Sequence, residues 1–401
     1  MMFNRREFLA RSLVGMAALA APVYSGKKER FPGTTVKNGL LHRKLGKTGV
    51  ILPVVSMGVM NTRDSALIRK AYEVGIRHFD TAASYGYGRN ETMIGDVIRD
   101  MGVRDRVVLA TKVLVPNLRR GLQPREIQTK CIQAVETSLG NLKTDRIDIL
   151  YLHDISSVDD VFIEGIPEAL TILKKQGKAR FVGFSTHQNM AACLNEAARQ
   201  PLYDVVLTSF NYSLADDSEL FRSLKTAAEQ GIGLIAMKTQ CGQYWYKQQL
   251  PDAQQKFFEG RIVNSAVLKW VLRHPFITTA VPGVTTFQHI DEDISAAKNL
   301  EFTSEEADFL REKNVQTGMG MCRQCRSCVA RCPKGVEIPT LMRAHMYATC
   351  YANPEQALQT LQSLPNPKGL YTCMQCSDCQ VVCPFSIDAP ARIRDLVNAS
   401  V

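Results

Sequence analysis

Eight of the twelve cysteines in this 401-residue chain lie near its C-terminal end, in two copies of one pattern. Each copy reads Cys-x-x-Cys-x-x-Cys-x-x-x-Cys-Pro. Three thiolates at this spacing suit three corners of a cubane cluster, and the Cys-Pro that follows usually ligates the other cluster of a pair. Zinc sites use two separated pairs of ligands, so the third cysteine step is more than zinc needs. The pattern therefore predicts two [4Fe–4S] clusters with eight cysteine ligands between them. These are Cys322, Cys325, Cys328 and Cys332 of the first run and Cys373, Cys376, Cys379 and Cys383 of the second.

Four other side chains that could handle a proton stand at or just after the ends of three successive apolar runs. Asp80 and Tyr85 follow the first of these runs, Lys112 ends the second and His153 ends the third. A carboxylate, a phenol, an ammonium and an imidazole can tune one another's pKa values and exchange protons when they lie together. Whether they do depends on the elements that carry them.

Between residues 54 and 299 the chain alternates short apolar runs with amphipathic segments. The runs predict strands at Val54–Gly58, His78–Ala82, Val107–Val113, Ile147–His153, Ala179–Ser185, Asp204–Phe210, Gly233–Lys238 and Thr278–Val284. The segments predict helices at Asp64–Ile76, Asn90–Asp100, Gln123–Leu142, Val158–Gln176, Asn189–Gln200, Ser218–Gln230, Arg261–His274 and Phe287–Asn299. Nearly continuous apolar strands indicate a parallel sheet covered on both faces. Eight strand–helix units in about 250 residues predict a closed (β/α)8 TIM barrel. No Gly-x-Gly-x-x-Gly follows the first strand, which counts against a Rossmann domain.

A barrel places its catalytic residues just beyond the C-terminal ends of its strands, so the Asp, Tyr, Lys and His are expected on one rim. With Gly183-Phe184-Ser185 and the turn Leu45-Gly46-Lys47-Thr48-Gly49, which is typical of a hairpin closing the barrel bottom, they make residues 40 to 300 resemble the aldo-keto reductases. The tetrad of that family is Asp, Tyr, Lys and His at these strand ends. The cysteine runs that follow make the chain similar to the ferredoxin-fused branch of the family.

The resemblance implies a catalytic role for each tetrad residue. Hydride reduction of a carbonyl creates an alkoxide, which a positioned acid must protonate. Tyr85 is expected to be this acid, with the Lys112 ammonium lowering its pKa from about 10 and Asp80 holding Lys112 in place. His153 is expected to donate a hydrogen bond to the substrate oxygen. Each residue alone has a structural explanation, but their joint occurrence at three successive strand ends favours the catalytic one.

The residues expected to hold a nicotinamide cofactor match the family less closely. Ser185 matches the serine that binds the carboxamide, whereas Thr186 stands where asparagine is usual. Leu207 takes the place of a glutamine, and Asn211 could compensate for it or simply cap a helix. Lys238 could face the pyrophosphate.

The site for the 2′-phosphate of NADP is also altered. Gly283, Val284 and His289 stand where phosphate-binding members of the family have lysine, serine and arginine. The phosphate clamp is therefore weakened, and both NADP and NAD remain candidate cofactors.

The N-terminal residues contain a candidate targeting signal. Asn4-Arg5-Arg6-Glu7-Phe8-Leu9 resembles the twin-arginine export signal, and the apolar stretch Ser12–Ala21 that follows is too short and too rich in Ala and Gly for a stable membrane span. Such signals are read by a receptor. We therefore expect a periplasmic or otherwise extracytoplasmic protein; a disordered basic tail is the alternative.

Length and composition set the domain organisation. The chain is 45% hydrophobic and can bury one large core and a smaller one. We predict a signal peptide and linker at 1–30, the barrel at 38–315 and a ferredoxin-type domain at 316–401. Helical patterns at Ile338–Cys350 and Pro354–Leu364 separate the cysteine runs, so this last domain is expected to be mostly helical. A compact ferredoxin with β-hairpins is the second choice.

The formal net charge of +10 suggests an acidic partner, but no long basic run favours nucleic acid. Basic residues in the first cysteine run either attract such a partner or form a solvated surface: Arg323, Arg326, Arg331 and Lys334.

Two functional hypotheses follow. The first is an exported oxidoreductase that transfers hydride between a tightly bound nicotinamide cofactor and a carbonyl or alcohol substrate, sugars included, with the clusters relaying electrons to a redox partner protein. The second is an iron–sulfur electron-transfer subunit whose barrel binds a ligand or partner without turnover. Substrate choice is expected to depend on the loops Tyr212–Asp217 and Gln240–Lys256.

Overall fold

The computed structural model describes residues 31–114, 121–240, 263–312, 320–376 and 379–400. The described residues from 33 onward form one compact unit, and of residues 1–32 only 31 and 32 are described. The twin-arginine motif, the apolar stretch after it and the expected domain boundary at 315/316 lie outside the described residues. In the part of the chain that is described, no helix is long and apolar enough to cross a membrane.

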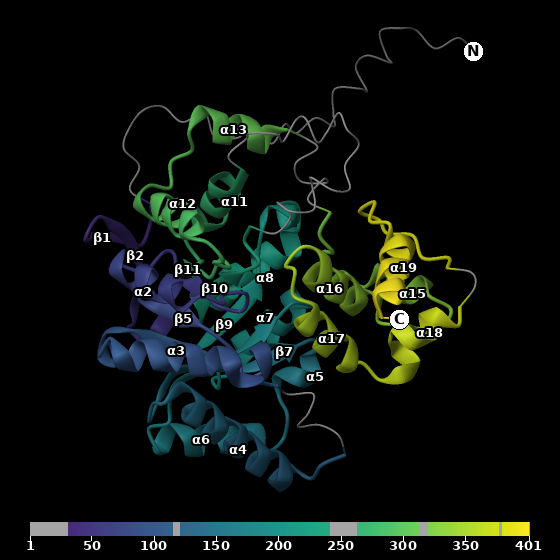
Figure 1. The fold of residues 1–401 in the computed structure, drawn as a ribbon, viewed down its shortest axis with the longest axis horizontal. Coiled ribbons are helices and arrows are strands. Elements are labelled where there is room, and N and C mark those ends of the chain that lie inside the picture. Colours follow the sequence, from purple (N-terminus) through teal and green to yellow (C-terminus); the bar gives the residue numbers. More distant parts are fainter. Residues whose placement is uncertain (1–30, 115–120, 241–262, 313–319, 377–378, 401) are drawn as a thin grey trace, which may run out of the picture. The chain divides into compact units, whose positions relative to one another are not determined.

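Eight parallel strands build the central sheet (Figure 1). Their bounds are β4 (Met57–Gly58), β5 (His78–Asp80), β6 (Val108–Leu114), β7 (Ile147–Ile155), β8 (Ala179–Thr186), β9 (Val205–Ser209), β10 (Gly233–Met237) and β11 (Thr279–Ala280). They lie side by side in chain order, from β4 to β11. Parallel bridges from Val55 to Ala280 and from Gly58 to Gly283 join the first strand to the last and close the sheet. The predicted (β/α)8 barrel is confirmed.

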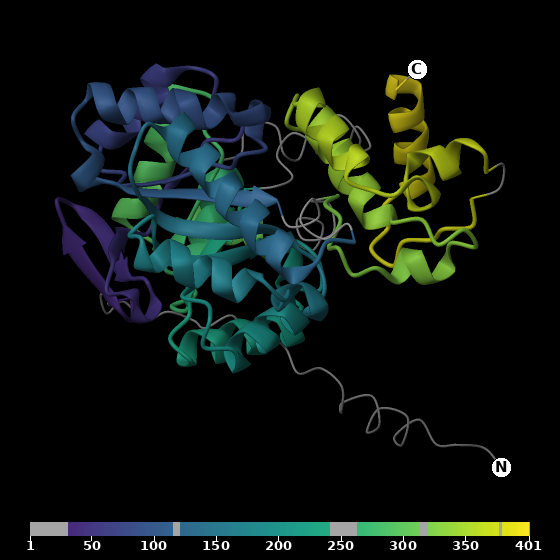
Figure 2. The same ribbon diagram turned by 90° about the horizontal axis from the view of Figure 1, so that it is seen from below.

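Helices follow the strands and pack around the sheet (Figures 1 and 2). They are α2 (Ser65–Glu73), α3 (Arg89–Asp100), α4 (Pro124–Leu142), α5 (Val158–Val161), α6 (Ile166–Lys175), α7 (Met190–Arg199), α8 (Ser218–Glu229), α11 (Val263–Leu272), α12 (Phe287–Lys298) and α13 (Ser304–Arg311). One expectation was wrong in detail, because the single helix predicted at Val158–Gln176 is divided into α5 and α6. Gly165 adopts a left-handed conformation between the two helices, with φ of 90°. Pro167 lies in the first turn of the second helix, where a proline is tolerated.

A three-stranded antiparallel sheet closes the bottom of the barrel. Its strands are β1 (Thr34–Lys37), β2 (Leu40–Lys44) and β3 (Ile51–Pro53), and the turn after β2 packs against the start of β10. Leu45 and Leu52 enter the barrel core, where they join alternate inward-facing strand residues: Ala110, Ile149, Tyr151, Val205, Leu207, Ile235 and Val281. The lower barrel is therefore filled with apolar side chains, which leaves the opposite rim for a polar site.

The C-terminal residues form a helical domain with its own core. Its helices are α15 (Ser327–Arg331), α16 (Ile338–Thr349), α17 (Pro354–Gln362), α18 (Leu370–Met374) and α19 (Ala389–Ser400). The helices α16 and α17 match the two predicted from the spacer between the cysteine runs. Five of the eight predicted cluster cysteines pack against the buried core of this domain: Cys322, Cys328, Cys332, Cys373 and Cys383. We call residues 320–400 the cluster domain.

Candidate active site

The four predicted tetrad residues meet at the C-terminal rim of the barrel. Asp80 ends β5, Lys112 lies in β6, His153 lies in β7, and Tyr85 starts the 3-10 segment Tyr85–Gly88 after β5. Lys112 Nζ donates to Asp80 Oδ1 at 2.5 Å and to the Thr81 carbonyl at 2.6 Å, and it lies 3.5 Å from the Tyr85 hydroxyl. Parallel neighbouring strands bring their ends to one edge, so residues 32 apart in the chain become hydrogen-bonded.

His153, on β7, faces Tyr85. The two rings meet edge to face, with centroids 5.9 Å apart, and the Ser84 hydroxyl lies 3.5 Å from His153 Nδ1. Burial, and then the charge of Lys112, lower the pKa of His153 to about 3. The imidazole is therefore neutral at physiological pH and can donate one hydrogen bond without carrying a charge.

The electrostatics of the Tyr85 phenol differ from the expectation. Burial raises the pKa of Tyr85 well above its usual value, and Asp80 is the next largest cause, in the same direction. Lys112 was expected to lower this pKa, but its ammonium is paired with Asp80 at 2.5 Å and lies farther from the phenol. Burial also raises the pKa of Asp80 and lowers that of Lys112, and their mutual attraction opposes both changes. In this structure Tyr85 holds its proton firmly.

The predicted nicotinamide contacts on β8 and β9 occupy different depths in the barrel. Ser185 Oγ accepts the backbone N–H of Asp154 at 3.0 Å, which leaves its hydroxyl hydrogen free to donate. The Thr186 hydroxyl donates to the Gln188 carbonyl at 3.0 Å. Leu207, assigned from the sequence to a family glutamine position, lies in the apolar barrel core. Ser209, two residues later on the same face of β9, is the one that reaches the rim.

The other predicted cofactor residues are spread along the rim. The Asn211 side chain accepts from the backbone N–H and hydroxyl of Ser213, so it caps a 3-10 turn, and its amide lies 3.5 Å from Met321 Sδ of the cluster domain. Gly283 is exposed beside Gly58, where the barrel closes. Lys238 follows β10 with a positive φ of 56° and has no acidic partner among the described residues. A cation at the rim that forms no salt bridge with the described residues fits a phosphate of a dinucleotide.

A cavity of about 20 Å³ lies between the barrel rim and the cluster domain. Its barrel side is formed by His187, Ser209 and Lys238, and its other side includes Cys322 and Gln324. Within the described ranges, His187 Nδ1 and Gln324 Oε1 are buried without a hydrogen-bond partner. A cavity of this size, with several polar groups in an otherwise apolar wall, suits one ordered water. It shows that a predicted cluster ligand lies close to the barrel rim.

The first of the two loops that were expected to select the substrate contacts α13 and the cluster domain. In the first loop, the Tyr212 hydroxyl donates to the Leu310 carbonyl at 2.5 Å, and Asp216 pairs with Arg323 of the cluster domain at 2.7 Å. Apart from Gln240, the loop Gln240–Lys256 lies outside the described residues. No local pattern in the sequence indicated that the cluster domain itself would cover the rim.

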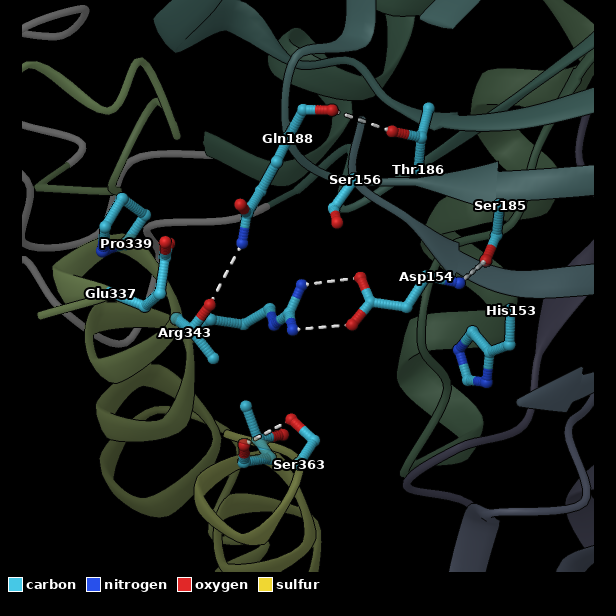
Figure 3. A network of polar contacts seen from close by, with 12 residues as sticks. His153, Asp154, Ser156, Ser185, Thr186, Gln188, Glu337, Pro339, Arg343 and Ser363 are labelled. Atoms are coloured by element: carbon cyan, nitrogen blue, oxygen red, sulfur yellow. Dashed lines mark hydrogen bonds and ion pairs between the residues drawn. The ribbon is translucent and has the colours of Figure 1, made fainter. Parts of the chain in front are cut away.

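The salt bridge of Arg343 with Asp154 is the clearest contact between barrel and cluster domain (Figure 3). Two bonds of 2.8 and 2.7 Å join the guanidinium of Arg343, on α16, to the carboxylate of Asp154, which directly follows His153. Beside it, the Gln188 amide donates to the Thr340 hydroxyl at 3.0 Å. The rim of the barrel is thus held directly against α16.

The eight predicted cluster cysteines fall into two mixed groups. The pKa of the Cys322 thiol is raised to about 12, first by burial and then by Cys328, Cys325 and Cys383. The pKa of Cys373 is raised to about 11, again first by burial and then by three cysteines: Cys332, Cys379 and Cys376. The fourth cysteine of each run therefore lies with the first three of the other, which is the arrangement expected for a pair of cubane clusters. Among the described residues, no three His, Cys, Asp or Glu side chains converge as ligands of one metal ion.

A comparison with protein families identifies both parts of the chain. The model of the aldo/keto reductase family matches residues 58–264, which is more than half of the sequence. The chain belongs to the aldo/keto reductase family. A model of a 4Fe-4S dicluster domain matches residues 321–388. The protein is therefore an oxidoreductase of the aldo-keto reductase type that carries a 4Fe-4S dicluster domain at its C-terminal end.

Its relatives in sequence and structure agree with this family. It is 26% identical to an L-galactose dehydrogenase of Arabidopsis thaliana, over 67% of this chain and 92% of the relative. It is 25% identical to an L-glyceraldehyde 3-phosphate reductase of Escherichia coli K12, over 66% and 90%. Among solved structures, the barrel is similar to an aldo-keto reductase of Bacillus halodurans in its holo form, with a TM-score of 0.55, 21% identity and coverage of 69% and 99%. A Klebsiella pneumoniae aldo-keto reductase in complex with NADPH matches with a TM-score of 0.51 and 23% identity, over 66% and 92%.

Proposed function

We propose that this aldo-keto reductase is an exported oxidoreductase that interconverts a small carbonyl compound and its alcohol, using a tightly bound nicotinamide cofactor. The observation that carries the proposal is the assembled tetrad, in which Lys112 joins Asp80 and Tyr85 while His153 faces Tyr85. A protonated phenol and a neutral imidazole that face each other at the rim suit proton donation and hydrogen bonding to one substrate oxygen.

Each tetrad residue has a distinct task in the proposed reaction. Tyr85 donates its proton to the substrate oxygen during reduction. In the reverse direction its phenolate accepts the proton of the substrate hydroxyl. His153, neutral because burial lowers its pKa to about 3, donates a hydrogen bond that orients the same oxygen. Lys112 stabilises the phenolate that Tyr85 becomes after losing its proton, and Asp80 fixes the position of Lys112. The Lys112 ammonium, 3.5 Å from the Tyr85 hydroxyl oxygen, would attract the negative charge that develops on this oxygen.

The rim residues fit a nicotinamide dinucleotide, which when bound supplies or accepts the hydride. Ser185 can donate its hydroxyl hydrogen to a carboxamide, and Lys238, which follows β10 at the rim, can bind a phosphate. Ser209 takes the rim position on β9 that Leu207 does not reach. A related structure contains NADPH, but the residues Gly283 and His289 leave NAD an equal candidate here.

The substrate class is proposed from the curated relatives. One is named for L-galactose and another for L-glyceraldehyde 3-phosphate, both sugars or sugar derivatives. We therefore propose a hydroxylated carbonyl compound of sugar size or smaller.

Two [4Fe–4S] clusters are proposed in the cluster domain, where they would pass single electrons. The two mixed groups of four cysteines fit this pair, and Cys322 lies on the cavity that adjoins Lys238. We propose that the clusters relay electrons between the barrel and a redox partner protein. Arg323 and Arg326 are paired within the chain, with Asp216 and Glu337, so the charge available to a partner is smaller than the sequence suggested.

Export by the twin-arginine route is proposed from the motif at residues 4–9. An exported enzyme has little free nicotinamide available to it, which is why we propose that the cofactor is tightly bound. Fractionation of producing cells, with N-terminal sequencing of the mature protein, tests this part. Protein found only in the cytoplasm with its first residues intact would contradict it.

A Tyr85→Phe variant of the full chain, prepared without oxygen, tests the enzymatic proposal. We expect nicotinamide-dependent turnover of aldehydes to fall by about 10²–10⁴-fold, because the acid is lost while the ring remains. Tyr87→Phe, which changes an exposed neighbouring tyrosine, is the matched control. Iron, sulfide and bound nucleotide are measured in all three proteins. Full iron with no nucleotide binding and no effect of Tyr85 would instead support an electron-transfer subunit without turnover.

A further inference from the structure

Helix α16 is buried on more sides than a surface helix usually is. Every residue from Ile338 to Tyr347 is buried, whereas a surface helix normally leaves one polar face in water. Leu341, Met342 and Ala344 belong to the core of the cluster domain. The opposite side carries Arg343 and Tyr347, which do not belong to that core. The helix is therefore enclosed between the cluster domain and the barrel.

The first contacts on this opposite side lie next to His153. Arg343 binds Asp154, the residue that follows His153 (Figure 3). Thr340 accepts a hydrogen bond from Gln188, which lies just after β8. Asp154 has a left-handed backbone conformation, with φ of 63°, and its N–H is bound by Ser185. These bonds place α16 over the part of the rim that holds the tetrad histidine and the expected carboxamide contact.

Tyr347, one turn after Arg343, reaches the rest of the rim. It is 6% exposed and lies in an apolar cluster with Met346, against which Met60 packs from the loop after β4. The Lys238 ammonium lies 5.2 Å from the centre of the Tyr347 ring, within the range of a cation–π contact. Among the causes that raise the pKa of Tyr85, the charge of Tyr347 comes after burial and Asp80.

We propose that α16 forms a wall of the substrate site and that Tyr347 is a specificity-determining residue that contacts the substrate held at Tyr85 and His153. This inference rests on the proposed reductase function. A tyrosine offers an apolar ring together with one hydroxyl group, so it suits a compound that presents C–H groups and hydroxyls. Tyr347 is therefore expected to select hydroxylated carbonyl compounds over unsubstituted ones. The cluster domain would then determine specificity as well as carry clusters.

Two aldehydes of equal chain length test this role: glyceraldehyde, with two hydroxyls, and propanal, with none. Both are assayed with the anaerobically prepared full-length holoprotein and its nicotinamide cofactor. Tyr347→Phe removes one neutral hydrogen bond, so we expect the KM for glyceraldehyde to rise about fivefold. The KM for propanal and both kcat values should stay within about twofold, because the ring remains. Tyr371→Phe, at an exposed tyrosine of the same domain, is the control and should change none of these constants.

The outcomes separate this inference from the function on which it rests. A KM ratio for the two aldehydes that Tyr347→Phe leaves unchanged, with wild-type activity present, overturns the role of Tyr347 alone. A wild-type protein that reduces neither aldehyde with either nicotinamide overturns the reductase proposal, and this inference with it. An equal loss of kcat on both aldehydes, or a loss of iron, would indicate a structural role and also overturn the inference.

Discussion

Replacement of Arg343 by methionine should loosen α16 from the barrel. The side chain of Arg343 is 6% exposed and that of Asp154 is 21% exposed, and two bonds of 2.8 and 2.7 Å join their charged groups. Burial alone would raise the pKa of Asp154, but Arg343 reverses this and holds it below its ordinary value. Methionine keeps an apolar stem of similar length and removes only the charge and the donors. The variant therefore leaves Asp154 charged and without its partner.

The size of the effect follows from the burial of the pair. Removing one partner of a fully buried ion pair costs about 3–5 kcal/mol. Because Asp154 keeps some exposure and can regain part of its hydration, we expect about 2–4 kcal/mol here. One factor of ten in an equilibrium constant corresponds to about 1.4 kcal/mol. The population in which α16 has left the rim should therefore rise by about 30- to 700-fold.

Hydrogen exchange of the α16 amides is the suitable assay. Unfolding of a multidomain protein with bound clusters is not two-state, so a single melting temperature would not isolate this contact. Local opening is measured residue by residue through exchange rates in the native state. We expect the exchange of α16 amides to accelerate in Arg343→Met by the factor given above, while amides of the lower barrel strands remain unchanged.

A second salt bridge between the same two parts of the chain supplies the control. Arg89 binds Glu355 through two bonds of 2.7 Å, but its side chain is 69% exposed. Exposed pairs contribute about 0–1 kcal/mol, so Arg89→Met should accelerate exchange by less than about fivefold. Asp154→Asn, which tolerates the left-handed backbone, should restore part of the protection lost in Arg343→Met, since it removes the unpaired charge. If Arg343→Met had no more effect than Arg89→Met, the reasoning from burial would be refuted.

Three further predictions concern protonation and the clusters. Since burial holds the pKa of His153 at about 3, the profile of kcat/KM between pH 5 and 8 should contain no ionisation that His153→Asn removes; finding one would contradict the neutral imidazole. Burial raises the pKa of Asp293 to about 8 from 3.8, so this carboxyl destabilises the fold increasingly as the pH rises from 4 to 8. Asp293→Asn should therefore slow thermal inactivation at pH 8, by the equivalent of about 6 kcal/mol at most, and not at pH 4; an equal effect at both pH values would count against it. Cys383→Ser combined with Cys322→Ser should leave about half of the iron, whereas Cys383→Ser with Cys373→Ser should lose both clusters; the opposite pattern of iron content would show that each run ligates its own cluster.

Much of this protein could be predicted from local sequence patterns. Apolar runs alternating with amphipathic segments were enough to predict the barrel, because each strand and helix depends mainly on residues within its own segment. The tetrad residues could be placed at strand ends for the same reason, and parallel neighbouring strands must bring their ends together, as Asp80 and Lys112 show. The cysteine spacing predicted its ligand groups in the same local way, since three thiolates lie on one short loop.

What the sequence could not reveal was how the two parts of the chain meet. Arg343 and Tyr347 are ordinary residues of a short helix, and nothing near them in sequence indicates Asp154 or Lys238 as partners. The pKa of Tyr85 also depended on tertiary structure, because burial and the pairing of Lys112 with Asp80 outweighed the expected effect of a nearby ammonium. Contacts between distant segments, and the exclusion of water that they cause, arise only when the folded surfaces pack together. Local sequence patterns were therefore sufficient to predict the fold and the chemical groups, whereas contacts between distant segments set the electrostatics of those groups and brought α16 over them.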